Sequence, residues 1–211
     1  MTKIRIAFLL SGSGTTLENL LHHIAMGIVP GEVVVVVADR PDTKGIERAK
    51  KRGIAAVVVD RKAWRDSASF DAAVSEAVRL AAPDLVVMGG FLRRWRPPPE
   101  LRGRVLNVHP ALLPAFGGKG FYGERVQQAV LDSGVKVTGC TVHFVDDEYD
   151  QGPIVAQAAV VVQSDDTLET LTQRVQEAER QLYPACVRLF AQGRLAVEGR
   201  RVRILPPRES E

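Results

Sequence analysis

The sequence predicts an α/β fold in which a doubly wound, mostly parallel sheet is followed by an antiparallel C-terminal extension. Two observations carry this prediction. In the first half, short β-branched runs alternate with segments whose apolar residues recur at helical spacing, an order typical of parallel strands joined by right-handed crossovers. In the second half, two longer β-branched runs are separated only by a polar loop, which indicates an antiparallel ribbon.

The strands expected in the first half are short and almost entirely apolar, as strands covered on both faces are. They are residues 4–10, 32–38, 54–59, 84–88 and 104–109. Helices are expected between them because apolar residues recur there at intervals of three and four, and Ser67 is a suitable N-cap. The stripes are Leu17, Leu20, Leu21 and Ile24, and Phe70, Val74, Ala77, Val78 and Ala81.

The second half differs in character. Residues 136–145 and 154–162 are the two β-branched runs, and the polar loop 146–152 joins them. We also expect a helix at 124–131, a small hairpin at 195–205 and a long helix between them. The stripe of the long helix is Leu168, Leu171, Val175, Ala178 and Leu182. Because no repeat or linker interrupts the chain, one domain is the expected count.

Composition limits the class of protein. The chain has 211 residues, of which 45% are hydrophobic and 25% charged, enough for a core and a solvated surface. The net charge is +3 and the densest cation cluster, residues 93–96, adjoins a proline run, so a pocket for an anionic small molecule is favoured over a nucleic-acid surface. Cys140 and Cys186 lack disulfide or metal spacing, and we expect buried thiols in a cytoplasmic protein without a signal peptide or membrane helix.

The segment SGSGTT at residues 11–16 lies between the first strand and the first helix. Glycines allow a tight turn there, and the helix N-terminus and the hydroxyls of Ser13, Thr15 and Thr16 are suited to binding phosphate. The alternative is a plain turn in which Thr15 or Thr16 only caps the helix. A full Rossmann fingerprint is not met because Leu17 replaces the third glycine, and no P-loop lysine follows.

Asn107 and His109 form the second candidate. Residues two apart on a strand point to the same face, so an amide and an imidazole are expected side by side where Pro110 ends the strand. An amide N–H stabilises a developing oxyanion and an imidazole transfers protons near neutral pH, which favours carbonyl chemistry. The alternative is a structural histidine beside an asparagine in a turn.

The acidic loop at residues 146–152 is the third candidate. From its spacing alone a solvated surface loop is favoured, and a metal site is disfavoured because no calcium-loop spacing or histidine cluster is present. His22 and His23 are adjacent in a helix and cannot both face one site. His143 lies in an apolar strand, where a hydrogen-bonded structural role is expected.

Four segments together resemble the folate-dependent formyltransferase family. The resemblance covers residues 4–193 and rests on the order of SGxG at 11–14, GFLR at 90–93, NVHP with LLP at 107–114, and TGCTVHFV with YDQGP at 138–153. It implies a Rossmann-like formyltransferase fold with a phosphate-binding half (1–103), a catalytic and folate-binding half (104–193) and a hairpin with tail (194–211). It implies formyl transfer from 10-formyltetrahydrofolate to the amine of glycinamide ribonucleotide in purine biosynthesis, without a metal.

The resemblance also implies the site residues. The catalytic residues are Asn107, His109 and Asp150, with protonated His109 stabilising the oxyanion and Asp150 supporting it. The implied ligand contacts are Gly12, Ser13, Gly14, Thr15 and Gln176 for phosphate, Glu179 for the amine, and Leu92, Arg93, Trp95, Val145 and Asp146 for folate.

The chain departs from the family pattern at three places. Thr16 replaces a frequent asparagine, and the basic residue that assists phosphate near Ser67 is Lys62 or Arg65. The Gly-rich segment 117–123 is longer than usual, and its Lys119 is a candidate for an anion. A folate hydrolase, a tRNA formyltransferase and a non-catalytic phosphate-binding module are the rival functions. We expect a monomer or homodimer that binds neither nucleic acid nor membrane.

Overall fold

The computed structural model describes residues 3–207. The chain divides into two compact units, Met1–Asn107 and Val108–Glu211. The expectation of a single domain with inner boundaries after residues 103 and 193 stays a prediction.

The first unit contains a parallel sheet. Its strands are β1 (Ile4–Leu10), β2 (Gly31–Ala38), β3 (Ala55–Val58), β4 (Leu85–Met88) and β5 (Val105–His109), whose last residues continue into the second unit. They are ordered β3-β2-β1-β4-β5, and every neighbouring pair is parallel. The sheet confirms the predicted parallel strands to within one residue at each end.

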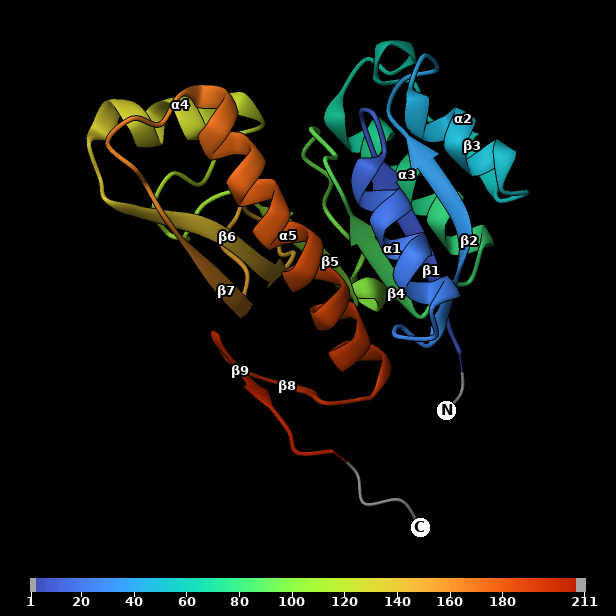
Figure 1. Cartoon of the computed structure of the whole chain (residues 1–211). Helices are drawn as coiled ribbons and strands as arrows, with labels where there is room; N and C mark the ends of the chain where they lie inside the picture. The colour runs from blue at the N-terminus through green and yellow to red at the C-terminus, as the bar shows by residue number, and fades with distance from the viewer. Residues whose placement is uncertain (1–2, 208–211) are drawn as a thin grey trace. The chain divides into compact units, whose positions relative to one another are not determined.

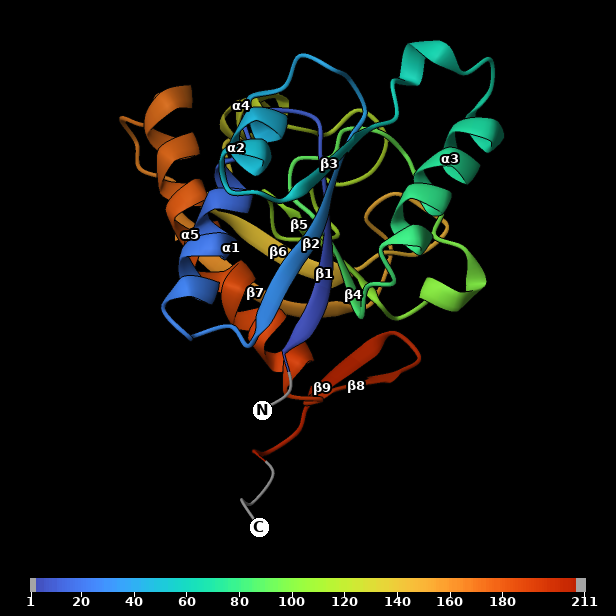
Figure 2. The same cartoon turned by 90° about the vertical axis from the view of Figure 1, so that its right-hand side faces the viewer.

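Helices cover both faces of this sheet, which confirms the doubly wound arrangement. They are α1 (Thr15–Ala25), α2 (Lys44–Lys51) and α3 (Ser67–Leu80), with short 3-10 turns η1 (Arg61–Ala63) and η2 (Pro99–Leu101). Figure 2 shows α1 and α2 on one side of β1 and β2, and α3 on the other.

Two details of the helices differ from expectation. Helix α2 is not predicted from the sequence, because Ile46 and Ala49 are its only apolar side chains and most of its other residues are charged. The prediction of Ser67 as an N-cap is wrong. Asp66 is the cap, since its carboxylate accepts the Ser69 N–H at 2.8 Å, and Ser67 is the first helical residue. Asp66 is the stronger cap here because its carboxylate carries a full charge at the positive end of the helix.

The core of the first unit lies between β1, β4 and their helices. Ile6, Phe8 and Leu85 are fully buried, as are Leu17 of α1 and Val74 of α3. Burial of one such side chain stabilises the fold by about 1.5–3 kcal/mol. These buried side chains therefore stabilise the strands from whose carboxyl ends the irregular loops extend.

The second unit contains an antiparallel sheet and two helices, as Figure 1 shows. Its strands are β6 (Val137–Phe144), β7 (Ile154–Val161), β8 (Leu195–Glu198) and β9 (Arg201–Ile204), and its helices are α4 (Glu124–Ser133) and α5 (Leu168–Ala191). β6 pairs with β7 and β8 with β9 in antiparallel fashion, while β9 runs parallel to β7. Helix α5 packs on β6, β7 and α4. The predicted ribbon, long helix and hairpin are all confirmed.

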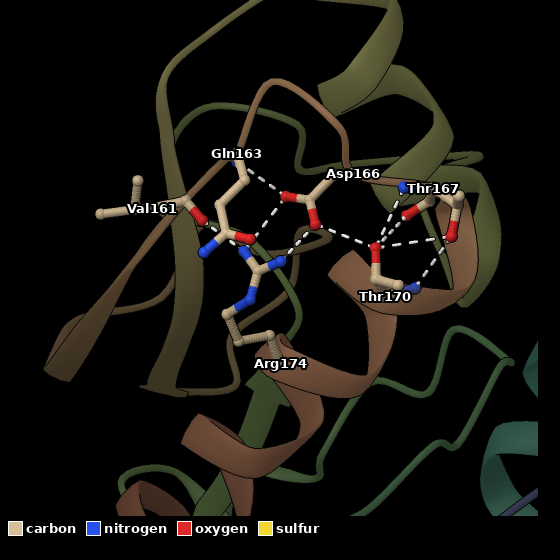
Figure 3. A network of polar contacts seen from close by, with 6 residues as sticks. All are labelled: Val161, Gln163, Asp166, Thr167, Thr170 and Arg174. Atoms are coloured by element: carbon tan, nitrogen blue, oxygen red, sulfur yellow. Dashed lines mark hydrogen bonds and ion pairs between the residues drawn. The ribbon is translucent and has the colours of Figure 1, made fainter.

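The start of α5 is tied to the end of β7 by a polar network (Figure 3). Arg174 donates to Val161 O at 2.5 Å and forms an ion pair with Asp166 through both ends of its guanidinium group. Thr167 and Thr170 cap the helix reciprocally, and the Thr170 hydroxyl also donates to Asp166 at 2.9 Å. The network therefore fixes where the long helix begins.

Candidate active site

The carboxyl end of β5 carries the predicted amide and imidazole. Asn107 is partly exposed and His109 is only 4% exposed, and the strand alternation places both side chains on the face opposite Leu106 and Val108. Leu106 is fully buried. Two polar side chains at the end of a buried strand have the position in which α/β folds bind ligands.

Asp150, from the loop after β6, reaches His109. Nδ1 of His109 lies 3.5 Å from Oδ2 of Asp150, and the two side chains are 5% and 10% exposed. Nε2 of His109 lies 2.8 Å from Phe116 O. Because a carbonyl oxygen only accepts, Nε2 carries the proton and donates to it. Nδ1 is therefore the nitrogen that faces the carboxylate.

The backbone holds Asp150 in an unusual conformation. Its φ is 55°, in the left-handed region that Asp adopts more readily than most residues. The Gly118 N–H donates to Oδ2 at 2.9 Å. A Cβ at Gly117 would lie 2.4 Å from Leu113 Cδ2 and 3.4 Å from Asp150 Cβ. The Gly-rich segment therefore supplies both the space for Asp150 and a donor to it.

His143 is a site residue that the sequence analysis missed. Its Nδ1 donates to Phe144 O at 2.9 Å, as expected of a structural histidine, but its Nε2 also lies 3.6 Å from Oδ1 of Asp150. The β6–β7 register shifts between Val142 and His143, and such a bulge redirects side chains near functional sites. Two buried imidazoles thus flank one carboxylate. The sequence feature that indicates a site role for His143 is its position at the end of a strand that leads directly into the acidic loop.

The protonation states follow from burial and charge. Burial lowers the pKa of His109 below the ordinary 6.5, although the Asp150 charge and the Phe116 carbonyl oppose this shift. Burial alone would raise the pKa of Asp150, but the His143 hydrogen bond, the His109 charge and the Gly118 N–H together lower it below 3.8. At neutral pH this arrangement therefore holds an ionised Asp150 beside a neutral His109. This differs from the expected imidazolium, because the effect of burial on the pKa of His109 is larger than the opposite effect of the Asp150 charge. His109 must therefore take up its proton during the reaction.

Buried hydrogen bonds fix the chain that follows His109. The Thr141 hydroxyl is fully buried, donates to Ala111 O at 2.7 Å and accepts the Leu113 N–H at 3.0 Å. Gln157 donates to Leu113 O at 3.0 Å, and Gln127 donates to Pro110 O at 2.6 Å. Side chains from β6, β7 and α4 thereby satisfy the backbone of a segment that has no regular partner, and they hold it in place.

The loop that contains Asp150 returns sharply to the sheet. Phe144 N donates to Pro153 O at 2.9 Å, and a Cβ at Gly152 would lie 1.8 Å from Phe144 O, so only glycine fits there. Of the predicted folate contacts in this loop, Val145 is half-buried and Asp146 is exposed. The exposed Asp146 carboxylate accepts the Glu148 N–H at 3.0 Å. The loop therefore presents polar backbone and side-chain groups at its surface.

In the first unit, the predicted phosphate loop packs closely against α2. A Cβ at Gly14 would lie 2.7 Å from Gly45 Cα, and Gly45 N donates to Gly12 O at 3.2 Å. Gly14 has a φ of 75° and is the N-cap of α1, without a side-chain cap. The alternative in which Thr15 caps this helix is therefore wrong, and glycine is required for both the turn and the contact.

The start of α1 presents donors. Glu18 N is the first amide to bond within the helix, to Gly14 O at 3.1 Å. The amides before it therefore have no intrahelical acceptor. Ser13 and Thr15 beside them are exposed. Hydroxyls and amides at a helix N-terminus form a suitable anion site, because the helix dipole adds to their hydrogen bonds.

The segment after β4 contains the other predicted folate residues. Leu92 is 42% exposed. Arg93 has a half-exposed side chain whose Nε donates to Oδ2 of the buried Asp39 at 2.8 Å. Trp95 is only 2% exposed, and its Nε1 donates to the Ser75 hydroxyl of α3 at 3.0 Å. Leu92 and Arg93 thus face outward, whereas Trp95 anchors their segment in the core.

Helix α5 carries the two remaining predicted residues. Gln176 and Glu179 are three residues apart and share one face of the helix. Gln176 is exposed to solvent, and Glu179 is half-buried. Burial raises the pKa of Glu179 to about 7, although the neighbouring Arg180 charge acts in the opposite direction. Glu179 is therefore an acid that changes charge near neutral pH.

Metal ligands, membrane spans and thiols are the remaining features of the part of the chain that the structure describes. Within residues 3–207, no three His, Cys, Asp or Glu side chains are grouped so as to hold a metal ion. None of the helices in that range is long and apolar enough to span a bilayer. Cys140 and Cys186 are free and buried, as expected, and burial raises the pKa of each thiol to about 12.

The His109–Asp150 pair, whose histidine lies at the carboxyl end of β5, is suited to proton transfer. The chain belongs to the formyl transferase family, whose model matches residues 4–187. The resemblance inferred from its motifs is confirmed. Glycinamide ribonucleotide transformylase 1 from Symbiobacterium toebii is a solved structure with a TM-score of 0.89 and 47% identity, and the match covers 97% of this chain and 95% of that chain.

Two curated proteins are also similar to this chain in sequence. The phosphoribosylglycinamide formyltransferase of Haemophilus influenzae is 34% identical over 196 residues, which are 92% of this chain and 90% of that protein. The trifunctional purine biosynthetic protein adenosine-3 of Gallus gallus is 39% identical over 197 residues, which are 92% of this chain but 19% of that protein. The chain thus spans about a fifth of the trifunctional relative.

Proposed function

We propose that this formyltransferase moves the formyl group of 10-formyltetrahydrofolate onto the primary amine of glycinamide ribonucleotide. The products are formylglycinamide ribonucleotide and tetrahydrofolate, in de novo purine biosynthesis. The observation that carries the proposal is the buried contact between His109 Nδ1 and Asp150 Oδ2, 3.5 Å apart. Relatives of nearly the same length, named for this activity, support it.

The first step forms the new C–N bond. The amine lone pair attacks the formyl carbon, and the carbonyl electron pair moves to oxygen. Asn107 donates its amide N–H to this oxyanion. The His109 Nε2–H, which bonds to Phe116 O in this structure, exchanges that carbonyl for the more negative oxygen. Donors held in place before the reaction lower its barrier because they need no reorganisation.

The second step moves a proton and breaks the old C–N bond. Neutral His109 accepts the proton of the attacking nitrogen at Nδ1 through a water molecule, and Asp150 orients this water and stabilises the imidazolium. The oxyanion then collapses and the bond to the folate nitrogen breaks. The electron pair of that bond takes up the proton from His109, which returns to its neutral form. Positioning and charge stabilisation suffice for this chemistry.

The ligand contacts are assigned to residues of both units. The substrate phosphate binds Gly12, Ser13, Gly14 and Thr15 with Gln176, and Glu179 accepts from the substrate amine. The folate head binds Leu92, Arg93, Val145 and Asp146, and Trp95 holds this segment from the core. The amides at the start of α1, which have no acceptor within the helix, and the exposed side chains of Leu92 and Arg93 support these assignments.

The compartment and the partners belong to the same proposal. We assign the enzyme to the cytoplasm, because its two buried, free cysteines fit a reducing environment. Its partners are the two small-molecule substrates. Its net charge of +3 offers little attraction for nucleic acid. It acts as a monomer or a homodimer.

The test mixes the protein with 10-formyltetrahydrofolate, with and without glycinamide ribonucleotide, and follows the folate absorbance. Formation of tetrahydrofolate only when both substrates are present supports transfer. Release of formate without the amine would instead establish a hydrolase. Binding of glycinamide ribonucleotide without any change in the folate would reduce the protein to a phosphate-binding module.

A further inference from the structure

Ser11 stands between β1 and the phosphate loop, but it is not itself a ligand group. The residue is only 1% exposed, whereas Ser13 two positions later is exposed. A buried hydroxyl needs hydrogen-bond partners within the protein, because leaving it unpaired is costly. The partners of Ser11 show what this residue is for.

Those partners lie in the segment that follows β4, about eighty residues along the chain. The Ser11 N–H donates to Gly90 O at 3.0 Å, and its hydroxyl oxygen accepts the Leu92 N–H at 2.8 Å. The two bonds bracket Phe91, which is buried at 8% exposure. Ser11 thereby fixes the backbone that presents Leu92 at the surface.

The loop after β2 secures Ser11 from the other side. Arg40 Nε donates to Ser11 O at 2.6 Å. The neighbouring Asp39 holds Arg93 through a separate bond of 2.8 Å, so it contacts the folate segment without contacting Ser11. Ser11 therefore connects the phosphate loop with the folate segment, whereas Asp39 is bonded to the folate segment alone.

We propose that Ser11 is a positioning residue that sets the phosphate loop and the folate segment relative to each other, so that its hydroxyl supports the binding of both substrates. This inference rests on the proposed function for the identity of the two ligands. The next residue, Gly12, begins the phosphate loop, and the bonded Leu92 begins the exposed part of the folate segment. A shift of Ser11 consequently displaces both segments.

The decisive experiment compares Ser11→Ala with Asp39→Asn and the wild type in steady-state assays. Ser11→Ala removes the acceptor of the Leu92 N–H and should raise the KM of both substrates by roughly three- to tenfold, the range expected for one lost hydrogen bond. Its kcat should change less, since no catalytic group is touched. Asp39→Asn should raise only the folate KM, because it weakens the ion pair with Arg93.

Val36→Ala supplies the control for stability. Val36 is fully buried in β2 and contacts no ligand segment in the proposal, so this variant should lower the melting temperature without raising either KM. If Ser11→Ala lowered the melting temperature but left both KM values unchanged, Ser11 would be merely structural. A rise in the folate KM alone would also overturn the shared role.

Failure of the inference and failure of the proposed function are separable. Formyl transfer by the wild type tests the function. If the wild type gave no transfer, calorimetric titration with tetrahydrofolate and with glycinamide ribonucleotide would still measure both affinities in Ser11→Ala. A loss of both affinities would retain the positioning role, and a loss of neither would refute it.

Discussion

The backbone N–H of Gly118 donates to Oδ2 of Asp150 at 2.9 Å. The same oxygen lies 3.5 Å from Nδ1 of His109. An amide N–H does not titrate, so this bond holds the carboxylate toward the imidazole at every pH at which Asp150 is ionised. The left-handed backbone of Asp150, with a φ of 55°, is maintained by the same contact. The Gly118 N–H thus holds the carboxylate of the proposed catalytic pair in its position beside His109.

Replacing Asp150 with Asn tests that pair. Asn keeps the shape, tolerates the left-handed backbone and still accepts from Gly118, but it lacks the charge that stabilises protonated His109. We expect kcat to fall by about 10²- to 10⁴-fold, the usual contribution of a positioned proton-transfer group, with little change in either KM. Steady-state kinetics measure this. Asp165→Asn, which removes an exposed carboxylate in the turn before α5, is the matched control and should retain activity. Near wild-type turnover in Asp150→Asn would refute the assignment.

The pH profile should report the neutral state of His109. Because burial lowers its pKa below 6.5, the imidazole remains able to accept a proton through neutral pH and loses this ability only in more acidic solution. We therefore expect the acid limb of kcat/KM for 10-formyltetrahydrofolate, measured at saturating glycinamide ribonucleotide, to lie below pH 6.5. In Asp150→Asn this limb should move further toward acid, since the charge that supports the imidazolium is gone. An acid limb above 6.5 in the wild type, or one that moves toward alkali in the variant, would contradict the prediction.

Glu179 should make amine recognition depend on pH. Its pKa is raised to about 7 by burial, so the carboxylate gains its charge as the pH rises through neutrality. If it accepts from the substrate amine, the KM of glycinamide ribonucleotide should fall across this range. Glu179→Gln should show a weaker pH dependence than the wild type, because titration of the amine itself remains in both. Identical pH profiles would exclude Glu179 from amine binding.

The network at the start of α5 should contribute to stability rather than to catalysis. Asp166→Asn weakens the bidentate pair with Arg174 and should lower the free energy of unfolding by about 1–2 kcal/mol. The pKa of Asp166 is lowered below 3.8, chiefly by the Arg174 hydrogen bond. Its contribution is therefore complete above 3.8 and is lost as the pH falls through the lower, folded-state value.

Urea unfolding at neutral pH and at about pH 3 measures this contribution. The difference between the wild type and Asp166→Asn should shrink at the lower pH. Asp165→Asn, which changes the neighbouring exposed carboxylate, should unfold like the wild type at both values. An equal destabilisation by both variants would show that loss of charge near the helix start, rather than the Arg174 pair, is responsible.

The strands and most helices could be predicted because their patterns are local. β1 was expected at residues 4–10, where it lies, and the long stripe from Leu168 indicated α5. Helix α2 was not predicted because two core contacts, Ile46 and Ala49, do not make a recognisable stripe in eight residues. The choice of Asp66 over Ser67 as the cap follows from the full charge that the Asp66 carboxylate places at the positive end of the helix.

The same distinction between local and long-range features applies to the site residues. Asn107 and His109 could be paired from the sequence, since alternation on one strand places them on one face. Spacing alone favoured a surface role for Asp150 and a structural role for His143. The register shift beside His143 depends on the pairing of β6 with β7, and the turn of the loop depends on the fit of Gly152 against Phe144 O.

By itself the sequence determined the strand order along the chain, the apolar faces, the family motifs and the amide–imidazole pair, because each of these depends on neighbours a few residues apart. Only the tertiary structure decided that Asp150 meets His109, His143 and Gly118, which tautomer His109 adopts and that His109 is neutral at rest. The physical reason is distance along the chain. Gly118 and Asp150 are 32 residues apart, and both their contact and the burial that sets the pKa of His109 exist only when the whole unit has folded.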